Sequence, residues 1–265
     1  MRLNSGGYSV RTKVIVSGGV IEVYDYEKPV MKGYKSNGGR DKEADEEGKE
    51  KNRKDSLRRA RQEVRRIVNA NVGAYGEQLT AKFLTLTFGD NVTDLDKANY
   101  EFKKFIQRLN YLVFGTKSGK LKYTVVVEFQ ERGAVHYHVI IYNIPYTRVE
   151  VIESIWGNGY VWINKIDNVD NVGAYICKYL TKAQEDERLR GRKCYFNSRG
   201  LFKPVVIEDE KKTETIKKSL PNELMTVSKQ YENEHLGKIS YRQYNLNRVK
   251  KGTNLEDSAM YNIVC

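Results

Sequence analysis

The hydrophobic pattern in the middle of the chain alternates between strand-like and helix-like stretches. Short runs rich in β-branched and aromatic residues, which are typical of strands, cover residues 83–88, 123–129, 135–143 and 159–163. Apolar residues at helical spacing predict helices over residues 93–109, 149–156 and 171–182. We expect Thr93, with Asp96 three residues later, to cap the first helix, and Asp170 or Asn171 to cap the last.

Both ends of the chain show further strand patterns. Residues 14–16 and 20–24 are apolar and flank a Ser-Gly-Gly turn, so we expect an N-terminal β-hairpin within residues 1–35. A weaker alternation over residues 226–248 indicates a late hairpin. It lies in a C-terminal extension, residues 206–265, whose role the sequence does not indicate.

Residues 36–72 form a charged segment. From about Lys35 to Lys54 the chain has almost no apolar residues, which indicates a flexible linker or an exposed loop. A helix is predicted from Asp55 or Ser56, as N-cap, to about Asn71. The surface of this helix carries five arginines: Arg58, Arg59, Arg61, Arg65 and Arg66. They either follow a DNA backbone or form a solvated basic face, and the sequence favours neither interpretation.

Composition and charge indicate a nucleic-acid partner. Lysine and arginine number 46 against 34 aspartates and glutamates, so the net charge is +12, and there are 19 tyrosines. Basic residues attract phosphates and aromatic rings stack on bases. Cys177, Cys194 and Cys265 are too far apart for a zinc site or a disulfide framework. With no signal sequence and no run of about 18 apolar residues, we expect a cytoplasmic protein with no membrane partner.

Two of the three histidines, His136 and His138, stand two residues apart in one predicted strand. Their side chains therefore leave the same face of the sheet. A three-residue hairpin loop ending at Gly133 would place Glu128 directly opposite His136, on that same face. The two imidazoles and the carboxylate then form a candidate site for a divalent metal, although strand histidines with ordinary hydrogen bonds are the alternative.

A stripe of tyrosine and lysine side chains marks the last predicted helix. Tyr175, Lys178, Tyr179 and Lys182 fall on one helical face, opposite an apolar stripe. Such a stripe usually reflects half-buried packing. Beside a metal site in a basic protein, the second interpretation is that a phenol acts as a nucleophile on phosphorus.

These motifs together resemble the HUH endonuclease superfamily, in particular rolling-circle replication initiators of bacterial plasmids and single-stranded DNA phages. The strand at residues 83–88 is similar to the first motif of that family, His136-Tyr137-His138 to the second, and the Tyr-x-x-x-Tyr-x-x-Lys helix to the third. Residues 193–204 resemble a segment that follows the third motif in related initiators. Two features depart from the pattern: no third histidine lies nearby, and both tyrosines are present where many relatives use one.

The resemblance covers residues 80–205, which we expect to form an α+β HUH nuclease domain with a central antiparallel sheet of about five strands flanked by helices. It implies nicking and rejoining of single-stranded origin DNA through a covalent 5′-phosphotyrosine. Glu128, His136 and His138 would hold Mg²⁺ or Mn²⁺, and Tyr175 or Tyr179 would attack, aided by Lys178 and Lys182. The Gly-rich stretch 115–120 does not match the Walker spacing, so a host helicase and polymerase are the expected partners.

Two rival functions fit the same sequence. A transposase or conjugative relaxase of the HUH class would use the same chemistry on different DNA. A non-catalytic single-stranded nucleic-acid-binding module would use the aromatic residues to stack bases. The sequence also leaves open whether the chain forms a homo-oligomer.

Overall fold

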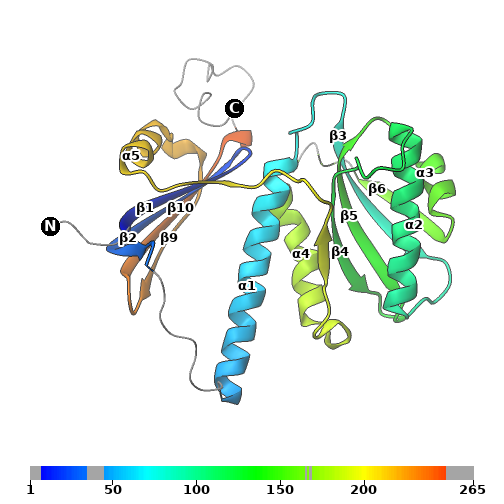
Figure 1. Cartoon of the computed structure of the whole chain (residues 1–265), viewed down its shortest axis with the longest axis horizontal. Coiled ribbons are helices and arrows are strands. Elements are labelled where there is room, and N and C mark those ends of the chain that lie inside the picture. The colour runs from blue at the N-terminus through cyan, green and yellow to red at the C-terminus, as the bar shows by residue number, and fades with distance from the viewer. Residues whose placement is uncertain (1–6, 35–44, 165, 167–168, 249–265) are drawn as a thin grey trace. The chain divides into compact units, whose positions relative to one another are not determined.

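The structure is a computed structural model that describes residues 7–34, 45–164, 166 and 169–248 (Figure 1). The chain divides into two compact units, one formed by residues 57–203 and the other by residues 1–56 together with 204–265. In the described residues, no helix is long and apolar enough to cross a membrane.

The unit formed by residues 57–203 is built on an antiparallel five-stranded sheet in the order β6-β3-β5-β4-β7. Its strands are β3 (Thr80–Phe88), β4 (Tyr123–Phe129), β5 (Val135–Ile144), β6 (Gly159–Asn164) and β7 (Tyr195–Asn197). Its helices are the C-terminal part of α1 (Glu46–Asn71), α2 (Leu95–Phe114), α3 (Val149–Trp156), α4 (Val172–Glu185) and the short η1 (Glu187–Leu189). The predicted α+β fold with a central antiparallel sheet flanked by helices is confirmed.

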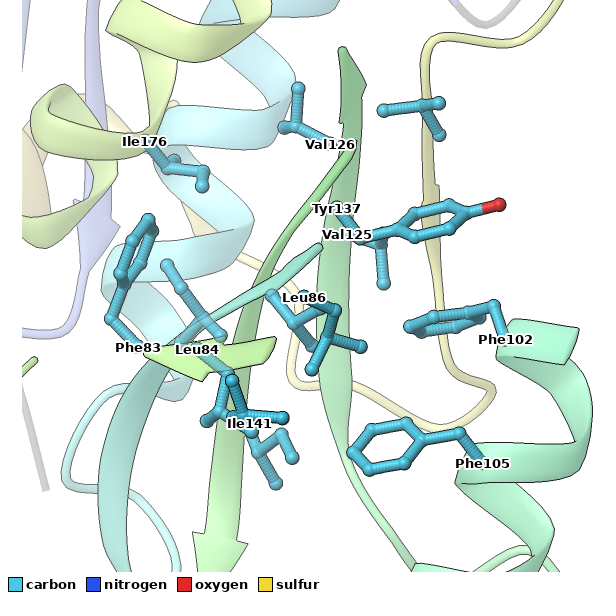
Figure 2. Close-up of a cluster of buried hydrophobic side chains, with 14 of the residues drawn as sticks. Phe83, Leu84, Leu86, Phe102, Phe105, Val125, Val126, Tyr137, Ile141 and Ile176 are labelled. Atoms are coloured by element: carbon cyan, nitrogen blue, oxygen red, sulfur yellow. The ribbon is translucent and has the colours of Figure 1, made fainter. Parts of the chain in front are cut away.

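The side chains of the sheet alternate between two covered faces, as the period of a strand requires. On one face, the Phe102 ring of α2 lies 4.9 Å from that of Tyr137, and Figure 2 shows Phe105 from the same helix pointing into the same cluster. On the other face, Ile176 of α4 lies near Phe83 (Figure 2). The sheet is therefore sandwiched between α2 and α4, and the two histidines of β5 lie on the α4 face.

Two predicted helix starts were wrong. The N-cap of α2 is Asp94, whose carboxylate accepts hydrogen bonds from the backbone of Asp96 and Lys97, so it replaces Thr93 in that role. The first helix begins at Glu46, well before Asp55 or Ser56. Polar sequence hid this extension because its stability comes from charge pairs one turn apart, such as Lys49 with Glu46 at 2.9 Å, and not from an apolar stripe.

The earlier part of the predicted linker, residues 35–44, lies outside the described residues. Residues 46–54, which we expected to belong to the linker, are helical.

The other unit contains a second antiparallel sheet in the order β8-β1-β2-β10-β9. Its elements are β1 (Tyr8–Ser17), β2 (Val20–Lys32), β8 (Val205–Ile207), α5 (Glu210–Ser219), η2 (Asn222–Leu224), β9 (Met225–Asn233), β10 (Gly237–Asn245) and η3 (Leu246–Arg248). Both predicted hairpins are present, as β1–β2 and β9–β10. The pairing of β2 with β10 joins the N-terminal and C-terminal segments of the chain in one sheet.

The core of this second unit lies between its sheet and α5. Ile216 and Leu220 at the end of the helix pack on Val14, Val23 and other buried residues of the strands. Burial of this apolar surface holds segments together that lie about 200 residues apart in the sequence.

Candidate active site

The hairpin between β4 and β5 has the register that the sequence predicted. Glu128 pairs with His136, and the loop closes with a hydrogen bond from the backbone nitrogen of Gln130 to the Ala134 oxygen at 2.9 Å. Gly133 has a φ of 89°, which a residue with a side chain rarely adopts. The turn therefore places the carboxylate and both imidazoles on one face of the sheet.

Glu128 and His138 are in direct contact. The Nε2 atom of His138 lies 2.8 Å from Oε2 of Glu128, and the histidine is only 5 % exposed. Lys182 of α4 lies 3.8 Å from the other carboxylate oxygen. The hydrogen bond from His138 lowers the pKa of Glu128 below its usual value, against the effect of burial, and the charge of Lys182 acts in the same direction. Glu128 is therefore an anion at neutral pH.

Each imidazole is also held by a threonine of β3. Thr87 Oγ1 lies 3.0 Å from Nδ1 of His136, and Thr85 Oγ1 lies 3.4 Å from Nδ1 of His138. The two pairs are cross-strand neighbours in the β3–β5 register. We did not assign these threonines a site role from the sequence. The only signal was that their spacing of two residues equals the spacing of the histidines.

Burial keeps His136 in its neutral form. Desolvation, helped by the nearby charges of His138 and Arg132 and opposed by that of Glu128, lowers the pKa of His136 to about 4. A neutral imidazole has a nitrogen lone pair available for a metal or a proton.

The tyrosine helix α4 faces this side of the sheet. The ring of Tyr179 stacks on the imidazole of His138, with centroids 3.7 Å apart, and its hydroxyl is hydrogen-bonded to that of Tyr175 at 3.2 Å. Phe83 of β3 contacts both tyrosine rings, with centroids 5.3 Å from Tyr175 and 5.5 Å from Tyr179. The two phenols and the histidine–carboxylate pair thus form one continuous cluster.

The two lysines of the stripe differ in their contacts. Lys182 lies beside Glu128, as described above, whereas the Nζ atom of Lys178 lies 5.6 Å from the ring centroid of Tyr175. Both side chains are exposed. Burial, with the hydrogen bond to Tyr175 and the charge of Glu128, raises the pKa of the Tyr179 phenol, so this phenol is protonated at neutral pH.

The position of α4 is set by α1. Asn171 is the N-cap of α4, as predicted, and the Oδ1 atom of Asn69 in α1 accepts a hydrogen bond from the backbone of Gly173 at 2.8 Å. A Cβ atom on Gly173 would lie 2.1 Å from the backbone oxygen of Arg65. Only glycine therefore permits this approach of the two helices, which the sequence did not indicate.

The five arginines of α1 do not share one environment. Arg58 and Arg59 are exposed, whereas the other three are half-buried. Arg61 donates a hydrogen bond from Nη1 to Oε1 of Gln184 in α4 at 2.9 Å, so it contributes to the contact between the two helices.

The residues predicted to hold a metal fit this role in chemistry, and the pair that they form must open to admit an ion. In the described part of the chain, no three His, Cys, Asp or Glu side chains stand together in a metal-binding arrangement. The donors, two imidazoles and a carboxylate, are nevertheless those of known divalent-metal sites. Threonine hydroxyls at both Nδ1 atoms are the outer contacts that orient histidine ligands.

The fold and these contacts define an α+β domain in which a His-x-His strand lies against a tyrosine helix. Residues 81–184 match a family model described as a replication-associated protein of the ORF2 type. This segment is thus a domain of a replication-associated protein family, and the predicted resemblance to rolling-circle replication initiators is confirmed over these residues. No curated protein matches the chain, and no solved structure matches it.

Proposed function

We propose that this chain initiates rolling-circle replication by nicking and rejoining single-stranded origin DNA. The observation that carries the proposal is the contact between the tyrosine helix and the histidine–carboxylate face. It brings the Tyr179 ring to 3.7 Å from the His138 ring, and it brings Lys182 to 3.8 Å from Glu128. A phosphate on this face would lie within reach of a phenol nucleophile and of positive charge.

The proposed reaction is a transesterification. The phenol oxygen of Tyr175 or Tyr179 forms a bond to phosphorus, and the bond between phosphorus and the 3′ oxygen breaks. The phenol loses its proton and the 3′ oxygen gains one, which leaves a 5′-phosphotyrosine and a free 3′-OH. The reverse attack by a 3′-OH rejoins the strand and frees the tyrosine, because the phosphodiester energy is retained in the covalent intermediate.

Side chains of this chain have distinct proposed roles. Because Tyr179 holds its proton at neutral pH, that proton must leave during the attack, and Lys178 and Lys182 would stabilise the charge that develops. Glu128, His136 and His138 would hold Mg²⁺ or Mn²⁺, an ion that polarises a phosphate when bound. Stacking of Tyr179 on His138 fixes the distance between the nucleophile and these ligands.

The proposed partners follow from the same reaction. Single-stranded origin DNA is the substrate, and the net charge of +12 favours its approach. The free 3′-OH would be extended by a host polymerase. A host helicase would open the duplex, since the sequence contains no Walker pattern. The five arginines of α1 are proposed to contact the DNA backbone, with Arg58 and Arg59 the exposed members of the set.

The test is formation of a covalent adduct. Full-length protein is incubated with Mn²⁺ and single-stranded origin DNA, and the products are separated on a denaturing gel, with a chelator in a parallel sample. We expect a protein–DNA adduct and a free 3′-OH fragment, both absent with the chelator. DNA binding without cleavage would instead support the non-catalytic module. Adducts with transposon ends or conjugative transfer origins, but not with a replication origin, would favour the transposase or relaxase.

A further inference from the structure

Two large aromatic side chains of the edge strand β6 face solvent. Tyr160 is 72 % exposed and Trp162 is 67 % exposed, whereas Val161 between them is only 5 % exposed. Because strand residues alternate between faces, the two rings lie on one side of the sheet and Val161 on the other. An edge strand with two exposed aromatic residues on one face is costly for a protein unless the surface binds something.

The strand register places these rings on the face of the proposed active site. Thr87 pairs with His136 on one side and with Tyr160 on the other, and Thr85 pairs in the same way with His138 and Trp162. Two rows therefore cross the sheet, each running from a histidine through a threonine to an aromatic ring. With strands about 4.8 Å apart, each ring lies two strands, or roughly 10 Å, from its histidine.

This part of the face is open, unlike the part that α4 covers. Trp156 of α3 packs on Phe88 with ring centroids 4.9 Å apart, which places α3 on the opposite face with Val161. Helix α4 contacts β4, three strands away from β6 in the sheet. The indole nitrogen of Trp162 donates a hydrogen bond to Oδ1 of Asn164 at 2.8 Å, so the ring has a fixed orientation.

We propose that Tyr160 and Trp162 form a stacking platform for bases of the single strand that flanks the scissile phosphate. The proposal rests on the proposed function for the identity of the ligand. A base presents a flat apolar face, and its phosphate carries the charge that a chain of +12 attracts. Stacking on the platform would hold the strand so that its backbone crosses the threonine rows toward the histidines. A base paired in a duplex has no free face and is excluded from the platform.

Tryptophan fluorescence gives a direct test. The chain has two tryptophans, and Trp156 is fully buried, so quenching by an added ligand reports on Trp162. The full-length chain carrying Tyr175→Phe and Tyr179→Phe is titrated with a single-stranded oligonucleotide and with the same sequence as a duplex. We expect quenching by the single strand only. Quenching that is equal for both forms, or absent for both, would overturn the proposal.

Variants separate stacking from a structural effect. Trp162→Ala should weaken single-strand binding, measured by anisotropy of a labelled oligonucleotide, about tenfold, whereas Trp162→Phe keeps a ring and should retain most of the affinity. Tyr146→Ala removes an aromatic residue that is 85 % exposed elsewhere in the same unit and is the matched control. Equal weakening by Tyr146→Ala and Trp162→Ala would contradict the platform.

The two proposals fail in different ways. Adduct formation by the unmodified chain without specific quenching of Trp162 would refute the platform and leave the nicking activity in place. Specific quenching that is lost in Trp162→Ala, without any adduct, would support the platform and refute the nicking activity.

Discussion

The ring of Tyr179 lies on the imidazole of His138, with centroids 3.7 Å apart and an angle of 29° between the planes. These residues are 41 positions apart in the sequence and belong to a helix and to a central strand of the sheet. Because the tyrosine stacks on the residue that also contacts Glu128, a shift of α4 would change both the nucleophile and the ligand set. The predictions below test the groups that hold this arrangement.

Thr87→Val should weaken metal use by the site. The substitution keeps a β-branched side chain in β3 but removes the hydroxyl that holds Nδ1 of His136 at 3.0 Å. Loss of such an outer contact typically costs about 10- to 100-fold in metal affinity. We expect the Mn²⁺ concentration for half-maximal adduct formation to rise by that factor. Thr80→Val, at the exposed start of the same strand, is the control and should leave the concentration unchanged. An unchanged requirement in Thr87→Val would show that the threonine does not support a ligand.

Gly173→Ala should disturb the seat of the tyrosine helix. Its Cβ would lie 2.1 Å from the Arg65 backbone oxygen, so α1 and α4 must separate. Overpacking of this kind costs about 1–3 kcal/mol, and each kcal/mol lowers Tm by about 2–4 °C in a domain of this size. Calorimetry and adduct assays should show a lower Tm and slower adduct formation. Gly119→Ala, with open space around its Cβ position, is the matched control. Equal Tm values for the two variants would contradict the close approach.

The hairpin shows how much of the site could be predicted from local sequence. The loop length and Gly133 determine the register, and the register alone places Glu128 opposite His136. The stripe of Tyr175 and Tyr179 likewise follows from helical spacing. Both predictions depend on interactions between residues that are close in the chain.

Contacts between distant segments could not be predicted in this way. Nothing local shows that Thr87 would pair with His136, or that Gly173 would meet Arg65, because these contacts depend on how strands and helices assemble. The pairing of β2 with β10 was missed for the same reason. Helix starts were missed where polar side chains decide them, as with the charged first turns of α1.

Asp25 should make the stability of the second unit depend on pH. Burial alone would raise its pKa, but hydrogen bonds from Lys217, Thr12 and Arg242 more than offset this, so its pKa lies below the ordinary value. The carboxylate therefore stabilises the fold above its unfolded pKa of about 4, and this contribution is lost as the pH falls below that value.

Urea unfolding of Asp25→Asn measures this effect. At pH 7 the variant should be less stable than the unmodified chain by about 1–3 kcal/mol, the usual range for hydrogen bonds to a charged group. The difference should shrink at pH 3. Glu232→Gln, which alters an exposed carboxylate of β9, should show little change at either pH. A difference for Asp25→Asn that is equal at both pH values would contradict the role of its charge.

Mapping the covalent link between protein and DNA tests the central proposal most directly. Trypsin cleaves after Lys178 and Lys182, so Tyr175 lies in a peptide of residues 166–178 and Tyr179 in a peptide of residues 179–182. After adduct formation and nuclease digestion, mass spectrometry should find a nucleotide phosphate on one or both tyrosines, and the Tyr175→Phe, Tyr179→Phe double variant should form no adduct. A phosphate on any other residue, or an adduct that persists in the double variant, would contradict the proposal.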